Sequence, residues 1–306
     1  MTRPTVLALA SLKPSEMNAK LHADYTVVQN IAQAQDARIV LTSGSAGLTQ
    51  AQMSQLPALE LIAVNGVGVD AVDLTEAHRR GIAVTTTPDV LSTAVAEMAL
   101  GLALTVGRRI TEGDRFIRGG HWVTGGKPTL GRSVIEGRAG ILGYGRIGRQ
   151  LAELLRGLGI QVFYTARSEK PEARGTYVAD SVVLARECDV LFVTAAGGDA
   201  SRHLVDASVL EALGPQGIVI NVARGPVINT AALAHALQAG IIGGAGLDVF
   251  DDEPAVPQSL LDAPNCVLTP HIASATDAAR GAMAALVLDN IAAYVAGRPL
   301  PTPYGG

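Results

Sequence analysis

The chain has 306 residues, of which 48% are hydrophobic, 17% are charged and only 4% are aromatic. This length holds about two domains with sizeable cores, so a peptide or a disulfide-stabilised mini-domain is excluded. The net charge of −4 provides no basic field for nucleic acid or an anionic membrane surface, so we expect a small-molecule partner. Abundant Ala, Val, Leu and Ile, together with 34 glycines, are typical of α/β proteins with buried parallel sheets.

Short β-branched runs alternate with helical patterns in the first part of the chain, as βαβ units require. Strands are expected over residues 5–10, 25–28, 38–42, 59–64 and 82–85. Helices are expected between them, over residues 15–22, 49–56 and 73–80. One long helix is then predicted from Ser92 to Arg118. It leads into a loop rich in Gly, Pro and Thr up to Gly131, which we interpret as a domain junction.

A second alternating series follows this junction. Its strands are expected over residues 139–142, 161–164, 190–195, 217–222, 244–250 and 266–268. A closing helix is expected from Asp277 to Val295, before a Pro-rich tail. The two series predict α/β architecture built on parallel sheets along the whole chain.

The N-terminal residues, the apolar runs and the cysteines all indicate a cytoplasmic protein. The first residues run directly into a strand pattern without the layout of a signal peptide. The longest apolar run, Met98 to Val106, is too short to cross a bilayer. Cys188 and Cys266 are far apart, which indicates neither a disulfide framework nor a zinc site. We therefore expect a cytoplasmic protein with no bound metal and no membrane partner.

A glycine-rich loop, Gly143-Tyr-Gly145-Arg146-Ile147-Gly148, follows an apolar strand and opens a helix expected over residues 149–156. In this context the first glycine makes a tight turn, the second lets backbone approach a pyrophosphate, and the third lets helix pack on strand. Backbone N–H groups at the helix start then hold the diphosphate. The loop predicts a dinucleotide site. The alternative is a purely structural, glycine-rich turn in a domain that binds no ligand.

The end of the next strand decides which dinucleotide is expected. NAD-binding proteins place an acidic residue about 20 positions beyond the loop to hold the ribose diol. Here Arg167 and Ser168 stand in that region instead, and a guanidinium with a hydroxyl suits a 2′-phosphate. NADP(H) is therefore the preferred cofactor, with NAD(H) the alternative if Arg167 is only a solvated surface residue.

Three further motifs stand at or just after the carboxyl ends of predicted strands, where open α/β sheets bind ligands. They are Asn221-Val-Ala-Arg224-Gly225, Asp248-Val-Phe-Asp-Asp-Glu253-Pro and Thr269-Pro-His271-Ile-Ala-Ser. Arginine can pair with a carboxylate, histidine can transfer one proton near neutral pH, and glutamate can orient that histidine. Reduction of a 2-oxo acid needs this set, because hydride arrival at the carbonyl carbon leaves an alkoxide that takes up a proton.

These four motifs, in this order, resemble the D-isomer-specific 2-hydroxyacid dehydrogenase family over nearly the whole chain. The resemblance implies that Arg224, Glu253 and His271 are catalytic, with His271 the acid in reduction and the base in the reverse reaction. It also implies that the amides of Val67 and Gly68 receive the substrate carboxylate, beside Arg224, and that Asp248 contacts the nicotinamide carboxamide. Val222, in the Asn221 motif, is a further expected cofactor contact.

The remaining histidines lack such a flanking motif, so we interpret them as structural or solvated residues: His22, His78, His121, His203 and His235. Glu253 alone could belong to a solvated acidic run, and Arg224 alone could cap a strand end. A solvated role for Glu253 and a capping role for Arg224 are both less favoured, because these two residues occur together with the His271 motif.

The substrate class is narrowed by the same resemblance, which is strongest for the glyoxylate/hydroxypyruvate and hydroxyphenylpyruvate reductases. Glyoxylate or hydroxypyruvate is the first choice and a bulkier aryl-pyruvate is the second. The loop around Gly66 has no basic residue to bind a phosphate, which argues against a phosphoglycerate dehydrogenase. A binding-only alternative is a nucleotide-sensing protein like the transcriptional co-repressors that share the fold.

The resemblance also implies the domain layout: two doubly wound, Rossmann-like domains with the active site in the cleft between them. The substrate domain would comprise residues 1–98 and 276–306, and the dinucleotide domain residues 99–275. A homodimer is implied through the helix near Ser92–Arg118, with Trp122 as a candidate subunit contact. A place for Trp122 in a core is the alternative.

Overall fold

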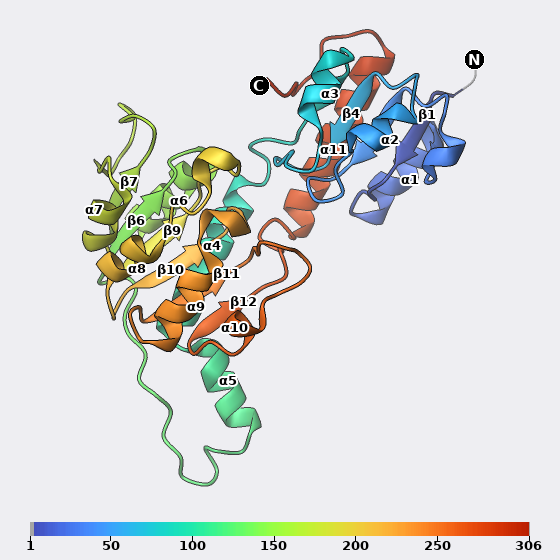
Figure 1. The fold of residues 1–306 in the computed structure, drawn as a ribbon. Helices are drawn as coiled ribbons and strands as arrows, with labels where there is room; N and C mark the ends of the chain where they lie inside the picture. The colour runs from blue at the N-terminus through green and yellow to red at the C-terminus, as the bar shows by residue number, and fades with distance from the viewer. Residues whose placement is uncertain (1–2, 306) are drawn as a thin grey trace. The chain divides into compact units, whose positions relative to one another are not determined.

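The computed structural model describes residues 3–305 and divides into two compact units (Figure 1). Unit 1 comprises Met1–Leu91 and Ser274–Gly306, and unit 2 comprises Ser92–Ala273. The expected boundaries, after residues 98 and 275, lie slightly further along the chain. The first observed boundary falls at the start of a helix, so that helix belongs wholly to unit 2.

Unit 1 is built on a five-stranded parallel sheet with the order β2-β1-β3-β4-β5, a doubly wound arrangement of the 2-1-3-4-5 type. Its strands are β1 (Thr5–Ala8), β2 (Thr26–Val28), β3 (Ile39–Thr42), β4 (Leu61–Val64) and β5 (Ala83–Thr85). Its helices are α1 (Ser15–Asp24), α2 (Gln50–Ser54), α3 (Leu74–Arg79) and α11 (Asp277–Val295), with a short 3₁₀ turn η1 (Ile31–Gln33). All five strands and all four helices match the expected positions, with ends that differ by a few residues.

Successive residues of these strands pack against different helices, as the two faces of a strand require. Ile39 and Leu41 belong to a core that includes Ile291 of α11. Val40, between them, belongs to a second core that includes Met53 of α2. Both faces of the sheet are therefore buried, which explains why β3 and β4 are buried throughout and apolar except for Thr42.

Helix α11 is long and apolar enough to cross a membrane by length and hydropathy alone, with 44% of the tested window buried. Its residues Ala284, Val287 and Ile291 are buried against strands of unit 1. A core helix of a folded domain passes the same test, and the packing accounts for its apolar composition.

Unit 2 is built on a seven-stranded parallel sheet with the order β12-β11-β10-β9-β6-β7-β8. Counted from β6, this is the 3-2-1-4-5-6 arrangement of dinucleotide-binding folds with one more strand at the far edge. The strands are β6 (Arg138–Leu142), β7 (Gln161–Thr165), β8 (Thr176–Tyr177), β9 (Val190–Val193), β10 (Ile218–Asn221), β11 (Gly244–Leu247) and β12 (Cys266–Leu268). The six expected strands are confirmed, and the two-residue β8 is an addition.

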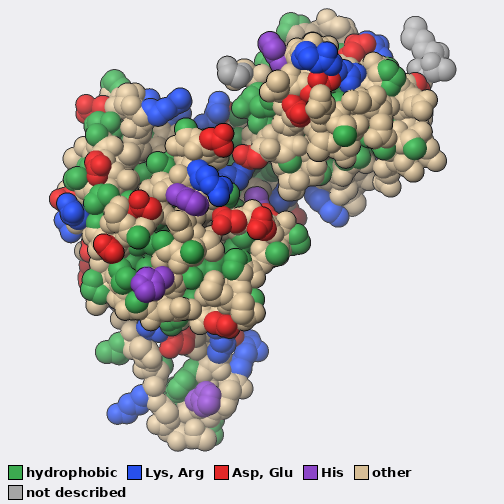
Figure 2. Space-filling view, viewed as in Figure 1, with side chains coloured by type: hydrophobic (Ala, Val, Ile, Leu, Met, Phe, Trp, Pro, Cys, Tyr) green, Lys and Arg blue, Asp and Glu red, His purple; other side chains and the backbone are tan. Residues whose placement is uncertain are grey.

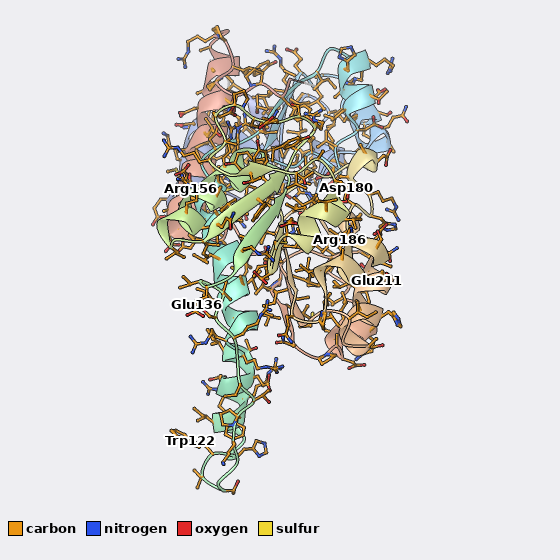
Figure 3. The ribbon with its side chains drawn as sticks, turned by 90° about the vertical axis from the view of Figure 1, so that its left-hand side faces the viewer. Trp122, Glu136, Arg156, Asp180, Arg186 and Glu211 are labelled. Atoms are coloured by element: carbon orange, nitrogen blue, oxygen red, sulfur yellow. The ribbon has the colours of Figure 1, made fainter. Side chains whose placement is uncertain are left out.

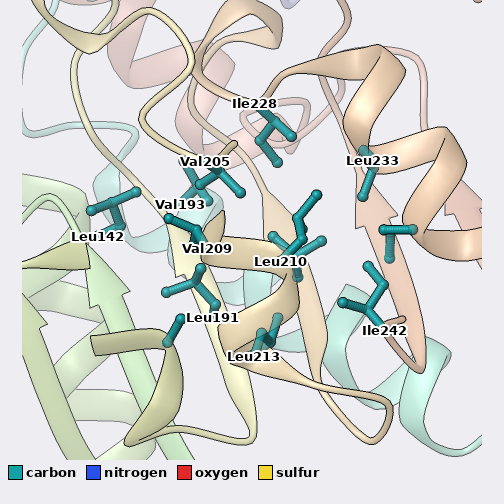
Figure 4. Packing of buried hydrophobic residues seen from close by; sticks show 14 of the residues in the cluster. Leu142, Leu191, Val193, Val205, Val209, Leu210, Leu213, Ile228, Leu233 and Ile242 are labelled. Atoms are coloured by element: carbon teal, nitrogen blue, oxygen red, sulfur yellow. The ribbon is translucent and has the colours of Figure 1, made fainter. Parts of the chain in front are cut away.

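The helices of unit 2 cover both faces of this sheet, and Figure 4 shows the apolar side chains packed beneath one set of them. The α-helices are α4 (Ser92–Gly107), α5 (Ile110–Arg118), α6 (Arg146–Gly157), α7 (Ser181–Arg186), α8 (Ala207–Leu213), α9 (Thr230–Gln238) and α10 (Gln258–Leu261). Two 3₁₀ turns, η2 (Asp199–Ser201) and η3 (Gly225–Val227), complete the unit.

The single helix predicted from Ser92 to Arg118 is wrong, because the chain forms two helices with a break at residues 108–109. Arg109 adopts a left-handed backbone conformation with φ of 53°. The carbonyl of Gly107 accepts a hydrogen bond from the Arg132 N–H at 2.8 Å, which belongs to the returning chain. The break therefore lies where the segment that includes α5 leaves the sheet and helix layers of unit 2 and returns to them.

That segment, which we call the arm (residues 110–131), extends away from the sheet of unit 2 (Figures 1 and 3). Helix α5 has no buried residue. Trp122 lies near the outer end of the arm and is 66% exposed. Val123 and Leu130 are more than nine-tenths exposed. Within this chain alone, Trp122 therefore does not lie in a core.

Candidate active site

The glycine-rich loop joins β6 to α6 at the carboxyl edge of the unit 2 sheet. Gly143 has φ of 102°, and a Cβ there would lie 2.5 Å from the backbone of Ala195. A Cβ on Gly148 would lie 2.3 Å from the Gly143 carbonyl oxygen, so this glycine permits close packing of the helix on the loop. Nothing lies within 4 Å of a Cβ built on Gly145. The three glycines thus have the separate roles that a diphosphate loop requires.

Helix α6 begins at Arg146, earlier than the expected start at residue 149. Its first N–H groups have no acceptor within the helix, and Gly145 provides no side-chain cap. The N–H groups of Arg146, Ile147 and Gly148 are therefore suited to bind an anion at the positive end of the helix dipole. The space beside Gly145 and these donors fit the diphosphate of a dinucleotide.

Arg167 and Ser168 follow β7, the strand beside β6. Leu142 pairs with Thr165, and the Gly143 N–H donates to the Thr165 carbonyl at 3.0 Å. This pairing places the loop after β7 at the same sheet edge as the glycine-rich loop. Both side chains are exposed there.

Arg224 lies in a loop that the Asn221 side chain shapes at the end of β10. Asn221 Nδ2 donates to the Arg224 carbonyl at 2.9 Å, and Asn221 Oδ1 accepts from the Ala223 N–H at 3.0 Å. The next residue, Gly225, approaches the backbone so closely that a Cβ there would lie 2.0 Å from the Phe250 carbonyl carbon. This close approach brings the Arg224 loop onto the loop that carries Glu253. Val222, in the same loop, is 6% exposed.

Glu253 and His271 form a direct pair. His271 Nδ1 lies 2.6 Å from Glu253 Oε2, and the other carboxylate oxygen accepts from the Phe250 N–H at 3.0 Å. The His271 side chain is 46% exposed, and its Nε2 has no hydrogen-bond partner among residues 3–305. His271 has φ of 51°, a left-handed conformation that is costly for a residue with a Cβ and is concentrated at functional sites. Glutamate thus fixes one ring nitrogen and leaves the other accessible.

The His271 loop is held in turn by Asp248, whose side chain is fully buried. Asp248 Oδ1 accepts from Thr269 Oγ1 at 2.6 Å and from the Ile272 N–H at 2.9 Å. Its Oδ2 accepts from the Ala273 N–H at 2.8 Å, and its carbonyl accepts from the His271 N–H at 2.9 Å. Sequence reasoning missed this role. The signal available was Asp248 directly after β11 and Thr269 directly after the neighbouring strand β12. The expected nicotinamide contact of Asp248 stays a prediction.

Val67 and Gly68 belong to unit 1, in the loop that follows β4. Neither backbone N–H has a hydrogen-bond acceptor within the described chain. The loop packs on its neighbour without space for larger residues: a Cβ on Gly44 would lie 2.7 Å from the Gly68 carbonyl oxygen. Two free donors on a closely packed loop suit a carboxylate. The substrate role that the family resemblance implies for them stays a prediction.

The other titratable groups form no second site of this kind. Of the histidines in residues 3–305, His271 is the one with a carboxylate partner within ion-pair distance. The same residues include no group of three or more His, Cys, Asp or Glu side chains that could hold a metal ion. In the view of Figure 2, basic, acidic and histidine side chains lie close together on one face of unit 2.

Comparisons with known proteins agree with this geometry. The model of the D-isomer specific 2-hydroxyacid dehydrogenase NAD binding domain matches residues 100–273. The 2-ketogluconate reductase of Gluconobacter oxydans is 41% identical over 308 residues, which cover 99% of each chain. The hydroxyphenylpyruvate reductase of Plectranthus scutellarioides is 41% identical over 89% of this chain and 86% of its own.

A solved structure is also similar over almost the full length. It is an NADPH-dependent glyoxylate/hydroxypyruvate reductase from Sinorhizobium meliloti in complex with NADP and malonate, and it has a TM-score of 0.93 and 38% identity. The match covers 99% of this chain and 97% of that one. Both the fold and the family expected from the sequence are confirmed: the chain belongs to the D-isomer specific 2-hydroxyacid dehydrogenase family, in its glyoxylate/hydroxypyruvate reductase-like branch.

Proposed function

We propose that this D-2-hydroxyacid dehydrogenase uses NADPH to reduce a small polar 2-oxo acid, with glyoxylate and hydroxypyruvate as first choices. The observation that carries the proposal is the 2.6 Å contact between His271 Nδ1 and Glu253 Oε2. A histidine oriented by a carboxylate can give a proton from its other nitrogen to an oxygen that becomes negative during reduction. The contact therefore supplies the acid that a carbonyl reduction needs.

The chain's own groups divide the remaining work. When bound, a nicotinamide supplies the hydride. His271 Nε2 donates the proton to the carbonyl oxygen, and in the reverse direction the neutral ring removes it from the hydroxyl. Arg224 pairs with the substrate carboxylate and polarises the adjacent carbonyl, and the N–H groups of Val67 and Gly68 are further carboxylate donors.

The preference for NADPH rests on Arg167 and Ser168. They follow β7, beside the glycine-rich loop. In this fold, residues at that position contact the adenosine ribose of a bound dinucleotide. No carboxylate stands between Thr165 and Ser168 to repel a 2′-phosphate. The similar reductase from Sinorhizobium meliloti is NADPH-dependent, which supports the same assignment.

The choice of a small acid rests on the loop after β4 and on the relatives. Residues 65–72 include no Lys or Arg that would bind a substrate phosphate. The relatives are reductases of acids of different size: 2-ketogluconate, hydroxyphenylpyruvate, and glyoxylate or hydroxypyruvate. All of these relatives are reductases, which favours catalysis over nucleotide sensing alone.

A substrate panel tests the proposal. Cofactor oxidation is followed at 340 nm with glyoxylate, hydroxypyruvate, hydroxyphenylpyruvate and 2-ketogluconate, each with NADPH and with NADH. We expect the highest kcat/KM for glyoxylate or hydroxypyruvate with NADPH. A higher value with the aryl acid or the sugar acid would overturn the substrate choice, a preference for NADH would overturn the cofactor choice, and no oxidation with any acid would favour sensing.

We also infer that the protein is a cytoplasmic homodimer whose subunits associate through the arm. In an isolated chain the arm leaves large apolar side chains in water, which is costly: Ile117 is 58% exposed, Trp122 66% and Val123 94%. Light scattering after gel filtration should give the mass of a dimer for the wild type. Trp122→Ala combined with Val123→Glu should give a monomer, and a wild-type monomer would contradict this inference.

A further inference from the structure

The loop that carries Arg167 and Ser168 is attached to a cluster of three tyrosines. Tyr164, at 1% exposure, lies between the other two, with ring centroids 4.1 Å from Tyr144 and 5.5 Å from Tyr177. Tyr164 and Tyr177 are paired residues of β7 and β8, the strands that the loop joins. The three rings pack against one another at tilted angles, with 35° between the planes of Tyr144 and Tyr164 and 52° between those of Tyr164 and Tyr177.

Two of the tyrosine hydroxyls hold the loop on either side of the Arg167-Ser168 pair. Tyr177 Oη donates to the carbonyl of Ala166, the residue before Arg167, at 3.3 Å. Tyr164 Oη accepts from the Lys170 N–H at 2.9 Å, and lies 3.4 Å from the Lys170 carbonyl oxygen, to which it can donate. Hydrogen bonds between the two tyrosine hydroxyls and the flanking residues Ala166 and Lys170 therefore bracket the segment 167–169.

The side chains around this segment concentrate positive charge. Lys170 Nζ donates to Ser168 Oγ at 3.3 Å, which joins a second cation to the Arg167-Ser168 pair. Of the two nearby carboxylates, Glu172 lies 3.5 Å from Arg149 of α6, so its charge is balanced there. Glu169 is exposed to solvent. Arg167, Ser168 and Lys170 can together present a guanidinium, a hydroxyl and an ammonium to one anion.

We infer that Tyr164 and Tyr177 are positioning residues for the 2′-phosphate of NADPH, and that Lys170 is a third contact to it. The inference rests on the proposed NADPH preference. Because the hydroxyls fix the backbone on both sides of Arg167 and Ser168, their loss leaves the charges in place but less well oriented. The effect should therefore fall on the 2′-phosphate and not on the diphosphate or on the chemistry.

The test uses Tyr164→Phe and Tyr177→Phe, which keep the packed rings and remove only the hydroxyls. Tyr294→Phe is the matched control, because its hydroxyl donates to Glu60 in unit 1. Calorimetry on the free enzyme measures the Kd of adenosine 2′,5′-bisphosphate and of 5′-AMP, and steady-state kinetics measures kcat and KM with NADPH and NADH. Circular dichroism and the Tm confirm that each variant is folded.

Loss of one hydrogen bond should raise the Kd of the bisphosphate and the KM for NADPH by about 2- to 10-fold. The Kd of 5′-AMP, the KM for NADH and kcat should stay at wild-type values, as should all values of the control. Variants that are folded and bind the bisphosphate as tightly as wild type would overturn the inference and leave the NADPH preference standing. A wild type that binds the bisphosphate no better than 5′-AMP would overturn that preference and this inference with it.

Discussion

The two units offer different groups at the edges where their strands end. In unit 1 the loop after β4 offers two backbone N–H groups, those of Val67 and Gly68. In unit 2 the loops after β10, β11 and β12 carry ionisable side chains, those of Arg224, Glu253 and His271. Both sheets are doubly wound and parallel, so the architecture alone does not decide which edge performs the chemistry. The residues placed on the loops decide it.

The two edges are also held in different ways. The unit 1 loop is fixed by backbone packing, because Gly44 and Gly47 leave no space for a Cβ. The unit 2 loops are joined by a buried carboxylate, Asp248, and by the pair of Glu253 with His271. A ligand carboxylate can be bound by fixed dipoles alone, whereas proton transfer requires a titratable group at a defined position. Substitutions at each edge should therefore have separable effects.

The largest effect is expected at His271. His271→Ala removes the proposed proton donor and should lower kcat by about 10²- to 10⁴-fold. The Kd for NADPH, measured by fluorescence titration, should remain close to the wild-type value because the glycine-rich loop is untouched. An equal loss of turnover and cofactor binding would indicate a folding defect and would contradict the assigned role.

Asp248→Asn comes next and should change stability as well as rate. The amide cannot accept all three bonds that the buried carboxylate accepts, which costs about 2–3 kcal/mol of unfolding free energy and lowers the Tm by about 4–12 °C. Turnover should fall because the His271 loop loses its anchor. Asp252→Asn, at an exposed position of the same region, is the control. Lost turnover with an unchanged Tm would limit Asp248 to cofactor contact.

A smaller and selective effect is expected at the unit 1 edge. In Gly44→Ala the new Cβ would meet the Gly68 carbonyl oxygen at 2.7 Å, so the loop has to shift. The KM for the 2-oxo acid should rise by about fivefold, the equivalent of one weakened hydrogen bond, with kcat retained. Ser45→Ala, an exposed neighbour, should leave both constants unchanged. A lower kcat with normal KM would refute the division of roles between the two edges.

The smallest effect is expected at the amino ends of the unit 2 strands, opposite the proposed site. Cys188 precedes β9 there, and Cys266 begins β12. Burial raises the pKa of each thiol from 9.0 to about 12. The native thiols should therefore resist alkylation at pH 8 and react only after unfolding. The stability that the neutral thiols contribute is complete below pH 9 and is lost as the pH rises towards 12. Replacing both by Ala should not change kcat, and rapid native alkylation would show that this edge is open.

The sequence predicted the catalytic motifs because each follows an apolar strand, and parallel strands end at one edge. It predicted neither the anchor at Asp248 nor the close approach of Gly225 to Phe250, because these join loops that are separate in the chain. The break at residues 108–109 also escaped prediction, since the residues around it have ordinary helical periodicity. A hydrogen bond from Arg132, far along the sequence, decides where that helix ends.

Isotope transfer tests the central claim most directly. The wild-type enzyme is given NADPH with deuterium on the transferable position of the nicotinamide, together with the most active 2-oxo acid, in ordinary water. The account predicts that deuterium appears on C2 of the 2-hydroxy acid, because hydride comes from the cofactor and His271 delivers only the proton on oxygen. A product whose C2 hydrogen comes from water would contradict it.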